Sequence, residues 1–324
     1  MDLHRIAYVL NIFPKISETF IASELAELRR RGVEVLILSL NPPKEEIHHR
    51  MVDEFGLLER TIYDRQHFMK ALEEFRPELL HAHFATAATD AARELAAKMG
   101  LPFTFTAHRY DIYHKPPPDF AARVSAAAGF ITVSNANARY ISETYGVPAG
   151  RINVIPCGVD TGLFKPSGKK SHIPNIVCVA RLHPIKNQRL LLEACAILVA
   201  RGIDFRCVLV GDGVCRTEIE DVRARLGLES VVDLVGAAEQ SQVLAWWHRA
   251  TVAVLTSENE GMPVCLMEAA ACGVPAVATA VGGIPELVLE GVTGMLVPSR
   301  DKEAFAVALE RILLDRELAE EMGD

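Results

Sequence analysis

Two neighbouring stretches, Thr251-Val-Ala-Val-Leu-Thr-Ser257 and Glu260-Gly-Met-Pro-Val-Cys-Leu-Met-Glu268, decide the fold. The first is short, apolar and β-branched, which is typical of a strand in a parallel sheet. The second leads into an alanine-rich segment that suits a helix over 264–272. Glu260 is therefore expected in the loop at the carboxyl edge of the sheet, and Glu268 in the first turns of the next helix. Open α/β sheets bind ligands at this edge.

The same loop favours an anion. Backbone N–H groups from Gly261 to Val264 are expected to point out of the start of the helix, where a helix attracts negative charge. The carboxylates of Glu260 and Glu268 accept hydrogen bonds from hydroxyl groups. Two carboxylates beside an anion site predict a ligand that carries both diols and phosphate, and a nucleotide-sugar has that chemistry.

Composition limits the class of protein. The chain has 324 residues, enough for two domains, and 50 % of them are hydrophobic. The net charge of −8 argues against a general nucleic-acid binder. The sequence has no run of about 18 or more apolar residues, so no membrane span is predicted. The cysteines, from Cys157 to Cys272, form no Cys-x-x-Cys pair and suit buried thiols, so we expect a cytoplasmic protein.

Short apolar runs alternate with amphipathic runs along the whole chain. Helices are predicted between the strands, including 18–31, 88–99 and 136–145. This βαβα order indicates parallel sheets with helices on both faces. Strands are predicted at 6–11, 33–40, 79–84, 103–107, 130–133 and 152–156 in the first half, and at 176–180, 205–210, 231–235, 252–255, 276–278 and 295–297 in the second.

A polar stretch rich in proline and glycine, Lys165-Pro-Ser-Gly-Lys-Lys-Ser-His-Ile-Pro174, interrupts this order and predicts a linker. We therefore expect an N-terminal domain over 1–164 and a C-terminal nucleotide-sugar-binding domain over 175–324. The predicted fold class is α/β, with two doubly wound, Rossmann-like domains facing each other across a cleft.

The second half resembles the nucleotide-sugar-binding domain of retaining glycosyltransferases of family 4, which have the GT-B fold. The first half resembles the subgroup that builds bacterial exopolysaccharide or lipopolysaccharide, including colanic-acid-type enzymes. Together the resemblance covers essentially the whole chain. The matching pieces are Phe13-Pro-Lys-Ile-Ser-Glu-Thr-Phe20, His81-Ala-His-Phe84, Thr106-Ala-His-Arg-Tyr-Asp111, Val154-Ile-Pro-Cys-Gly-Val-Asp160, Val179-Ala-Arg-Leu-His-Pro-Ile-Lys-Asn187, Val210-Gly-Asp-Gly213, the stretch from Glu260 to Glu268, and Gly282-Gly-Ile-Pro-Glu286.

Two departures from the family bear on function. Many members carry a Gly-Gly loop after the first strand that approaches the donor phosphate, and here residues 14–19 replace it. The chain also ends at Asp324, where family members usually continue into a helix that crosses back to the first domain. We expect this crossover helix to be missing, with consequences for domain closure.

The resemblance implies metal-independent transfer of a hexosyl group from a nucleotide-sugar to a saccharide or lipid-linked acceptor, with retention of anomeric configuration. The donor is expected to be a UDP- or GDP-sugar, and neither a cofactor nor a nucleic-acid partner is expected. Contact with the inner face of the cell membrane is at most peripheral. The acceptor belongs to the first domain and the donor to the second. The implied catalytic residues are His108, Arg181, Lys186 and Glu260.

Donor chemistry explains several of these assignments. The departing diphosphate needs positive charge, and the sequence has no Asp-x-Asp motif to hold a metal, so Arg181 and Lys186 are expected to neutralise it. Glu268 is expected to bind the ribose diol and Glu260 the sugar hydroxyls, unless either acid only stabilises the helix dipole. The implied donor-binding residues are Gly211, Asp212, Gly213, Glu260, Gly261, Met262, Pro263, Val264 and Glu268.

Other candidates keep two interpretations. The loop that contains Ser17 and Glu18 either meets donor phosphates through its N–H groups, or Ser17 only caps the helix after it. His83 either faces the acceptor or is structural, and Asp111 either orients His108 or caps the next segment. Gly211 and Gly213, like Gly282 and Gly283, either approach the donor or only form turns, and the role of Glu286 is open.

Alternative functions are a GT-B-type nucleotide-sugar epimerase, which needs no acceptor, and an inactive nucleotide-sugar-binding domain. A nicotinamide dehydrogenase is poorly supported, because no Gly-x-Gly-x-x-Gly follows the first strand.

Overall fold

The computed structural model describes residues 3–43, 48–167 and 171–324. The chain forms two compact units, unit 1 (Met1–Gly158) and unit 2 (Val159–Asp324). This division falls before the predicted linker at 165–174, because Phe164 is already buried in a core of unit 2. Residues 168–170 of the predicted linker lie outside the described residues.

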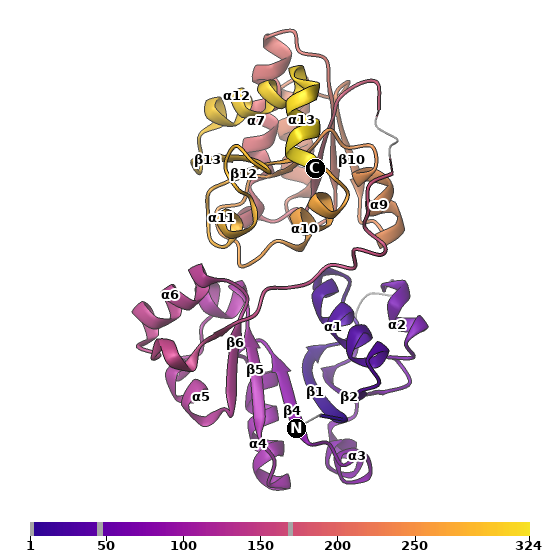
Figure 1. The fold of residues 1–324 in the computed structure, drawn as a ribbon, viewed down its shortest axis with the longest axis vertical. Coiled ribbons are helices and arrows are strands. Elements are labelled where there is room, and N and C mark those ends of the chain that lie inside the picture. The colour runs from indigo at the N-terminus through magenta and orange to yellow at the C-terminus, as the bar shows by residue number, and fades with distance from the viewer. Residues whose placement is uncertain (1–2, 44–47, 168–170) are drawn as a thin grey trace. The chain divides into compact units, whose positions relative to one another are not determined.

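Unit 1 is built on a parallel seven-stranded sheet in the order β3-β2-β1-β4-β5-β6-β7 (Figure 1). Its strands are β1 (Arg5–Ile12), β2 (Glu34–Asn41), β3 (Thr61–Ile62), β4 (Leu79–His83), β5 (Phe103–Ala107), β6 (Gly129–Thr132) and β7 (Asn153–Val154). Its helices are α1 (Thr19–Arg30), α2 (Arg50–Glu54), α3 (Phe68–Phe75), α4 (Ala87–Met99), α5 (Phe120–Ala126) and α6 (Asn135–Tyr145).

Alternate residues of each strand face opposite sides of this sheet, as the pleat requires. In β1, Ala7 and Val9 belong to a core that also contains residues of α3, α4, α5 and α6. Ile6, Tyr8 and Leu10 belong to a second core with residues of α1 and α2. Apolar side chains on both faces are what a sheet covered by helices on both sides needs.

Unit 2 is built on a parallel six-stranded sheet in the order β10-β9-β8-β11-β12-β13 (Figure 1). Its strands are β8 (Asn175–Val179), β9 (Arg206–Val210), β10 (Val232–Gly236), β11 (Val252–Leu255), β12 (Ala276–Thr279) and β13 (Gly294–Val297). Its helices are α7 (Gln188–Ala200), α8 (Arg216–Arg225), α9 (Gln240–Trp247), α10 (Val264–Ala271), α11 (Ile284–Leu287), α12 (Lys302–Leu314) and α13 (Arg316–Gly323).

The faces of the second sheet are divided in the same way. Ile176 and Cys178 of β8 lie in a core with α7, α8, α12 and α13, whereas Val177 lies in a core with α9, α10 and α11. Each unit is thus a doubly wound α/β domain, which confirms the prediction of two Rossmann-like domains. Among the described residues, no helix combines the length and apolar character required to cross a membrane.

Strand order reverses once in each sheet. In unit 1 the chain runs outward from β1 to β3 and then returns to place β4 on the other side of β1. In unit 2 it runs from β8 to β10 and returns to place β11 beside β8. The loops after these strands separate at such switch points, which is where open α/β sheets hold ligands.

Candidate functional site

The loops after β8 and β11 are tied together at the switch point of unit 2. The Glu258 N–H donates to the Ile185 carbonyl at 2.8 Å, and the Thr256 hydroxyl donates to the Lys186 carbonyl at 3.0 Å. These bonds accompany an ion pair between the Lys186 ammonium and the Glu260 carboxylate. Two candidates that the sequence indicated separately therefore form one charged pair at the carboxyl edge of the sheet.

The Glu260 side chain is held on several sides. It is 5 % exposed, and the Ser257 hydroxyl donates to the same oxygen that pairs with Lys186, at 2.6 Å. The Glu260 carbonyl accepts from the Gly283 N–H at 3.2 Å. A Cβ at Gly282 would lie 1.8 Å from that carbonyl oxygen, so only glycine fits there. Close packing against Glu260 therefore explains Gly282.

The second carboxylate, Glu268 on α10, is 7 % exposed and accepts from the Trp247 indole at 3.4 Å. Burial raises the pKa of Glu268 to about 7, and the indole hydrogen bond offsets part of that rise. The pKa of the Cys265 thiol is raised by burial, lowered by Lys186, and raised again by Glu260 and Glu268. The pKa of this one thiol is thus affected by both carboxylates and by the ammonium of unit 2.

The loop after β9 packs directly on the loop after β8. A Cβ at Gly211 would lie 2.1 Å from the Ala180 carbonyl oxygen, and one at Gly213 would lie 2.4 Å from the Leu182 carbonyl oxygen. Both glycines have positive φ, +139° and +156°. Asp212 is exposed, and its carboxylate accepts from the Gly213 N–H at 2.7 Å. Packing between the two loops thus accounts for the Gly-x-Gly pattern.

The remaining donor candidates lie around the same edge. Arg181 is exposed on the loop after β8, and its carbonyl accepts from the Gln188 side chain at 2.8 Å. Gly261 and Pro263 are buried, and Met262 is half-buried. Pro263 is the N-cap of α10, so the predicted backbone start of this helix is present, with Val264 as its first residue.

In unit 1, His83 ends β4 and His108 follows β5. Their rings are stacked 5.3 Å apart, with His83 Nδ1 3.0 Å from His108 Nε2. Asp111 is fully buried and accepts from the backbone N–H groups of His108 at 2.9 Å and Ala85 at 2.6 Å. Asp111 therefore fixes two backbone turns rather than the ring of His108. Burial raises the pKa of Asp111 to about 7, although these N–H donors lower it.

Three side chains that sequence reasoning did not assign, Glu24, His81 and Tyr8, complete this group. Glu24 on α1 lies 3.4 Å from His83 and accepts from the Tyr8 hydroxyl at 2.5 Å. Burial, together with the neighbouring His83, lowers the pKa of His81 to about 3, although Glu24 opposes this shift. Burial alone would raise the pKa of Glu24, but His83 and His81 outweigh it and lower that pKa. The His-x-His spacing, which puts both rings on one face of a strand, was the available signal.

The loop after β1 carries the last two candidates. Glu18 forms an ion pair with Lys15 at 2.5 Å, and Ser17 is exposed within a short 3-10 helix (Ile16–Glu18). Glu18 is the N-cap of α1, which has no side-chain capping hydrogen bond. The capping interpretation of Ser17 is therefore wrong.

Solved structures share this architecture. Anabaena HepE, described in complex with UDP-glucose, aligns with a TM-score of 0.83 at 18 % identity over 98 % of this chain and 92 % of its own. A glycosyltransferase from Rickettsia africae aligns with a TM-score of 0.81 at 19 % identity, over 100 % of this chain and 92 % of its own. At these identities the likeness shows the fold, which is that of GT-B glycosyltransferases.

Sequence comparison identifies the family. Residues 160–324, more than half of the chain, match the model of glycosyl transferases group 1, and residues 17–163 match that of glycosyltransferase family 4. The chain belongs to the glycosyl transferases group 1. The D-inositol 3-phosphate glycosyltransferase of Thermobispora bispora is 28 % identical over 91 % of this chain and 80 % of its own length. The putative colanic acid biosynthesis glycosyltransferase WcaL of Escherichia coli is 28 % identical over 94 % and 89 %.

Proposed function

We propose that this glycosyltransferase moves a hexosyl group from a UDP- or GDP-sugar to a saccharide or lipid-linked saccharide, without a metal at the diphosphate and with retention of configuration. The observation that carries the proposal is the ion pair of the half-buried Lys186 with the buried Glu260 at the switch point of unit 2. It combines a cation for phosphate with an acceptor for sugar hydroxyls in one place. A role in exopolysaccharide synthesis fits the name of one relative, the putative colanic acid biosynthesis glycosyltransferase WcaL.

Each donor residue has a role in this proposal. Glu268 accepts from the ribose diol, Glu260 accepts from hydroxyls of the transferred sugar, and Arg181 and Lys186 neutralise the diphosphate. The start of α10, 261–264, directs backbone N–H groups at the same anion. The glycine loop at 211–213 and Asp212 border the nucleotide.

The ion pair explains how the charged groups of the site are stabilised before a donor binds. Without a phosphate, Glu260 compensates the charge of Lys186, and neither group is left unpaired. A bound diphosphate competes for the ammonium and frees a carboxylate oxygen for a sugar hydroxyl. As the glycosidic bond breaks, charge on the leaving diphosphate grows, and its attraction to Lys186 grows with it.

Retention is supported by the state of Glu260. Its carboxylate is held by Lys186 and Ser257, which suits an acceptor of hydrogen bonds rather than a nucleophile. We infer a front-face transfer in which the leaving phosphate takes the proton of the acceptor hydroxyl. Unit 1 supplies the acceptor side through His108, with His83 packed against its ring, the backbone around Asp111 fixing the loop of His108, and Ser17 and Glu18 in the loop after β1.

Thermal unfolding in EDTA tests the donor site. The full chain is heated alone and with UDP, GDP, ADP or NAD, and then with sugar-charged forms of any ligand that binds. A ligand at a hundred times its Kd stabilises the fold by about 2.7 kcal/mol. We expect a shift with UDP or GDP that Glu268→Ala abolishes and Glu229→Gln, an exposed acid of the same unit, leaves unchanged. A shift only with NAD, or one that persists in Glu268→Ala, contradicts the proposal.

Product analysis tests the reaction. Incubation with donor and acceptor saccharide should give a new glycoside whose anomeric configuration, read by NMR, matches that of the donor. Conversion of the donor without acceptor into its sugar epimer would instead identify an epimerase.

A further inference from the structure

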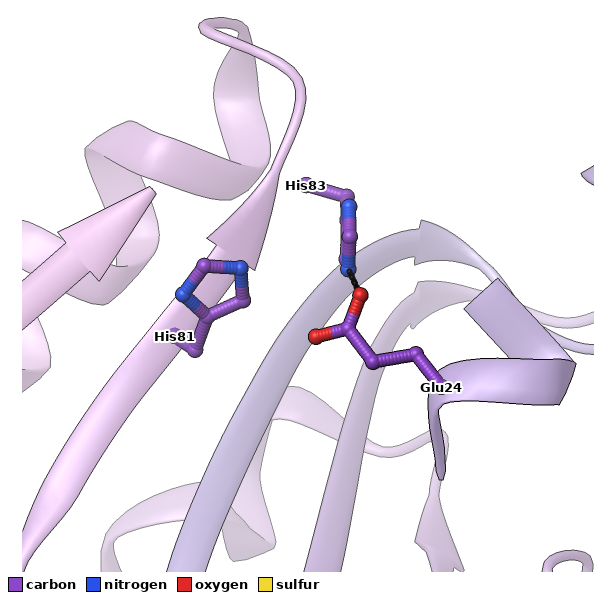
Figure 2. A group of neighbouring side chains, drawn as sticks. All are labelled: Glu24, His81 and His83. Carbon is purple, nitrogen blue, oxygen red and sulfur yellow. Dashed lines mark ion pairs between the residues drawn. The ribbon is translucent and has the colours of Figure 1, made fainter. Parts of the chain in front are cut away.

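A second cluster, outside the donor site, lies at the switch point of unit 1. Glu24 of α1 and His81 and His83 of β4 each offer one ligand atom, and these atoms lie within 4.8 Å of one another. Figure 2 shows the Glu24 carboxylate and the edges of both imidazole rings turned toward a common space. Two imidazoles and a carboxylate are the usual ligand types of a divalent transition-metal ion with an open coordination position.

The separation of two of these atoms suits a shared ion better than a hydrogen bond. His83 Nε2 lies 3.4 Å from Glu24 Oε2, whereas charge-assisted hydrogen bonds are about 2.7–2.9 Å long. The buried Nε2 has no hydrogen-bond partner among the described residues, and the His83 side chain is only 1 % exposed. Two ligands that are each ~2.0–2.1 Å from a tetrahedral ion lie about 3.4 Å apart.

Both histidines are held at their other nitrogen, as ligand histidines usually are. His81 Nδ1 lies 2.7 Å from Thr104 Oγ1, and His83 Nδ1 lies 3.0 Å from His108 Nε2. A proton on each Nδ1 leaves the Nε2 lone pairs for the ion. The Thr106 hydroxyl lies 3.2 Å from His81 Nε2, and this longer contact is the one that an ion would replace.

The Glu24 carboxylate, like the two histidines, has one atom held by a neighbouring side chain. Glu24 Oε1 accepts from the Tyr8 hydroxyl at 2.5 Å, which leaves Oε2 directed at His83. The Glu24 side chain is 43 % exposed, so it gives an ion a path from solvent into an otherwise buried group. Every member thus has one atom fixed by a neighbour and one atom toward the cluster.

We propose that Glu24, His81 and His83 bind one divalent transition-metal ion, with Zn²⁺ as the expected occupant. Mg²⁺ and Ca²⁺ prefer sets of oxygen ligands and fit two imidazoles poorly. The ion orders the ring of His83 and, through it, His108. Its ligands belong to unit 1, whereas the residues proposed to bind the diphosphate belong to unit 2, and no step of the proposed transfer reaction requires the ion.

Metal binding to the full chain tests this proposal. The protein is stripped with EDTA, dialysed against Zn²⁺ or Co²⁺ with excess Mg²⁺, and its metal content is measured. We expect one Zn²⁺ or Co²⁺ per chain and a Co²⁺ absorption spectrum typical of nitrogen and oxygen ligands, without thiolate charge-transfer bands. Glu24→Gln and His83→Gln should weaken binding by about 100-fold or more, because outer-shell changes alone cost about 10–100-fold.

The matched control is Glu27→Gln, an exposed acid on the same helix that pairs with Arg31. It should bind metal like the parent, and circular dichroism establishes that each variant is folded. Metal held equally by Glu24→Gln would sit elsewhere, for example on the free cysteines, and would overturn the proposal. Absence of bound metal in the parent would overturn it as well. UDP or GDP binding by the same samples reports on the donor site independently.

Discussion

Replacing Glu268 by glutamine separates the stability of unit 2 from its affinity for the donor. The substitution keeps the shape of the side chain and an oxygen that can accept from the Trp247 indole, 3.4 Å away. It removes the negative charge and one of the two acceptor oxygens. We therefore expect the glutamine variant to be more stable than the parent at alkaline pH and to bind donor more weakly.

The size of the stability effect follows from the pKa of Glu268. Burial raises this pKa from 4.5 to about 7, so the folded chain keeps a proton that the unfolded chain has released. Stability contributed by this group is full below about pH 4.5 and is lost as the pH rises through 7. At ~1.4 kcal/mol per pH unit the loss is about 3 kcal/mol. The glutamine of Glu268→Gln does not titrate, so this variant should not lose that stability as the pH rises.

The affinity effect has the opposite sign. In the proposed donor site the ionised carboxylate accepts from both ribose hydroxyls, so donor affinity of the parent should rise with pH and level off above about 7. Hydrogen bonds to charged groups contribute about 1.5–3 kcal/mol, so Glu268→Gln should bind about 10- to 100-fold more weakly at pH 8. A sugar-charged donor is the right ligand, because its diphosphate has no proton that titrates near pH 7.

Urea unfolding and calorimetric binding between pH 5 and pH 8.5 measure both effects, with Glu229→Gln as the surface control. Equal pH dependence of unfolding in Glu268→Gln and the parent would refute the burial argument. Unchanged affinity in a folded Glu268→Gln would refute its contact with the ribose.

Three further changes test the remaining parts of the two clusters. Lys186→Met leaves the buried carboxylate of Glu260 unpaired, so urea unfolding should show that the free energy of unfolding falls by about 3–5 kcal/mol. Adding Glu260→Gln should restore most of this stability, and no recovery would contradict the mutual neutralisation of the two charges. Gly202 has a positive φ of +72° and nothing within 4 Å of the place that a Cβ would take, so Gly202→Ala should cost about 1–2 kcal/mol of stability. Gly282→Ala, at φ +55° and against the Glu260 carbonyl, should cost more and should also reduce UDP or GDP binding. Equal losses of stability in the two variants would contradict the close packing at Gly282. Tyr8→Phe removes the hydroxyl that holds the carboxylate of the proposed metal site, so Zn²⁺ should bind about 10–100-fold more weakly in equilibrium dialysis, and unchanged binding would exclude that role.

The sequence was sufficient for the architecture because strands of parallel sheets are continuous apolar runs. The predicted strands 103–107 and 252–255 coincide with β5 and β11, and most others differ by one or two residues at an end. β3, of only two residues, was not predicted, because so short a strand has no periodicity to detect. The predicted linker at 165–174 was placed on composition, which does not show that Phe164 is already anchored in unit 2.

The sequence indicates single candidate residues where a motif contains them, but it does not indicate their partners. Lys186 and Glu260 are 74 positions apart, and only the order of strands in the sheet reveals that their loops adjoin. Glu24 is a further case, since a glutamate on an amphipathic helix resembles any solvated acid. Its contact with His83 depends on how α1 packs against β1 and β2, and no spacing in the sequence encodes that.

The two switch points accommodate charged side chains by the same physical rule. A parallel sheet covered on both faces leaves its carboxyl edge as the region where loops diverge and polar side chains can avoid the apolar cores. Even there, isolated charges are costly, so each is matched: Glu260 with Lys186 in unit 2, and Glu24 with His83 and Tyr8 in unit 1. The matching differs in kind. An ammonium and a carboxylate can exchange partners with a phosphate and a hydroxyl, which suits a substrate that comes and goes. Two imidazoles fixed from behind by neighbouring side chains suit an ion that stays.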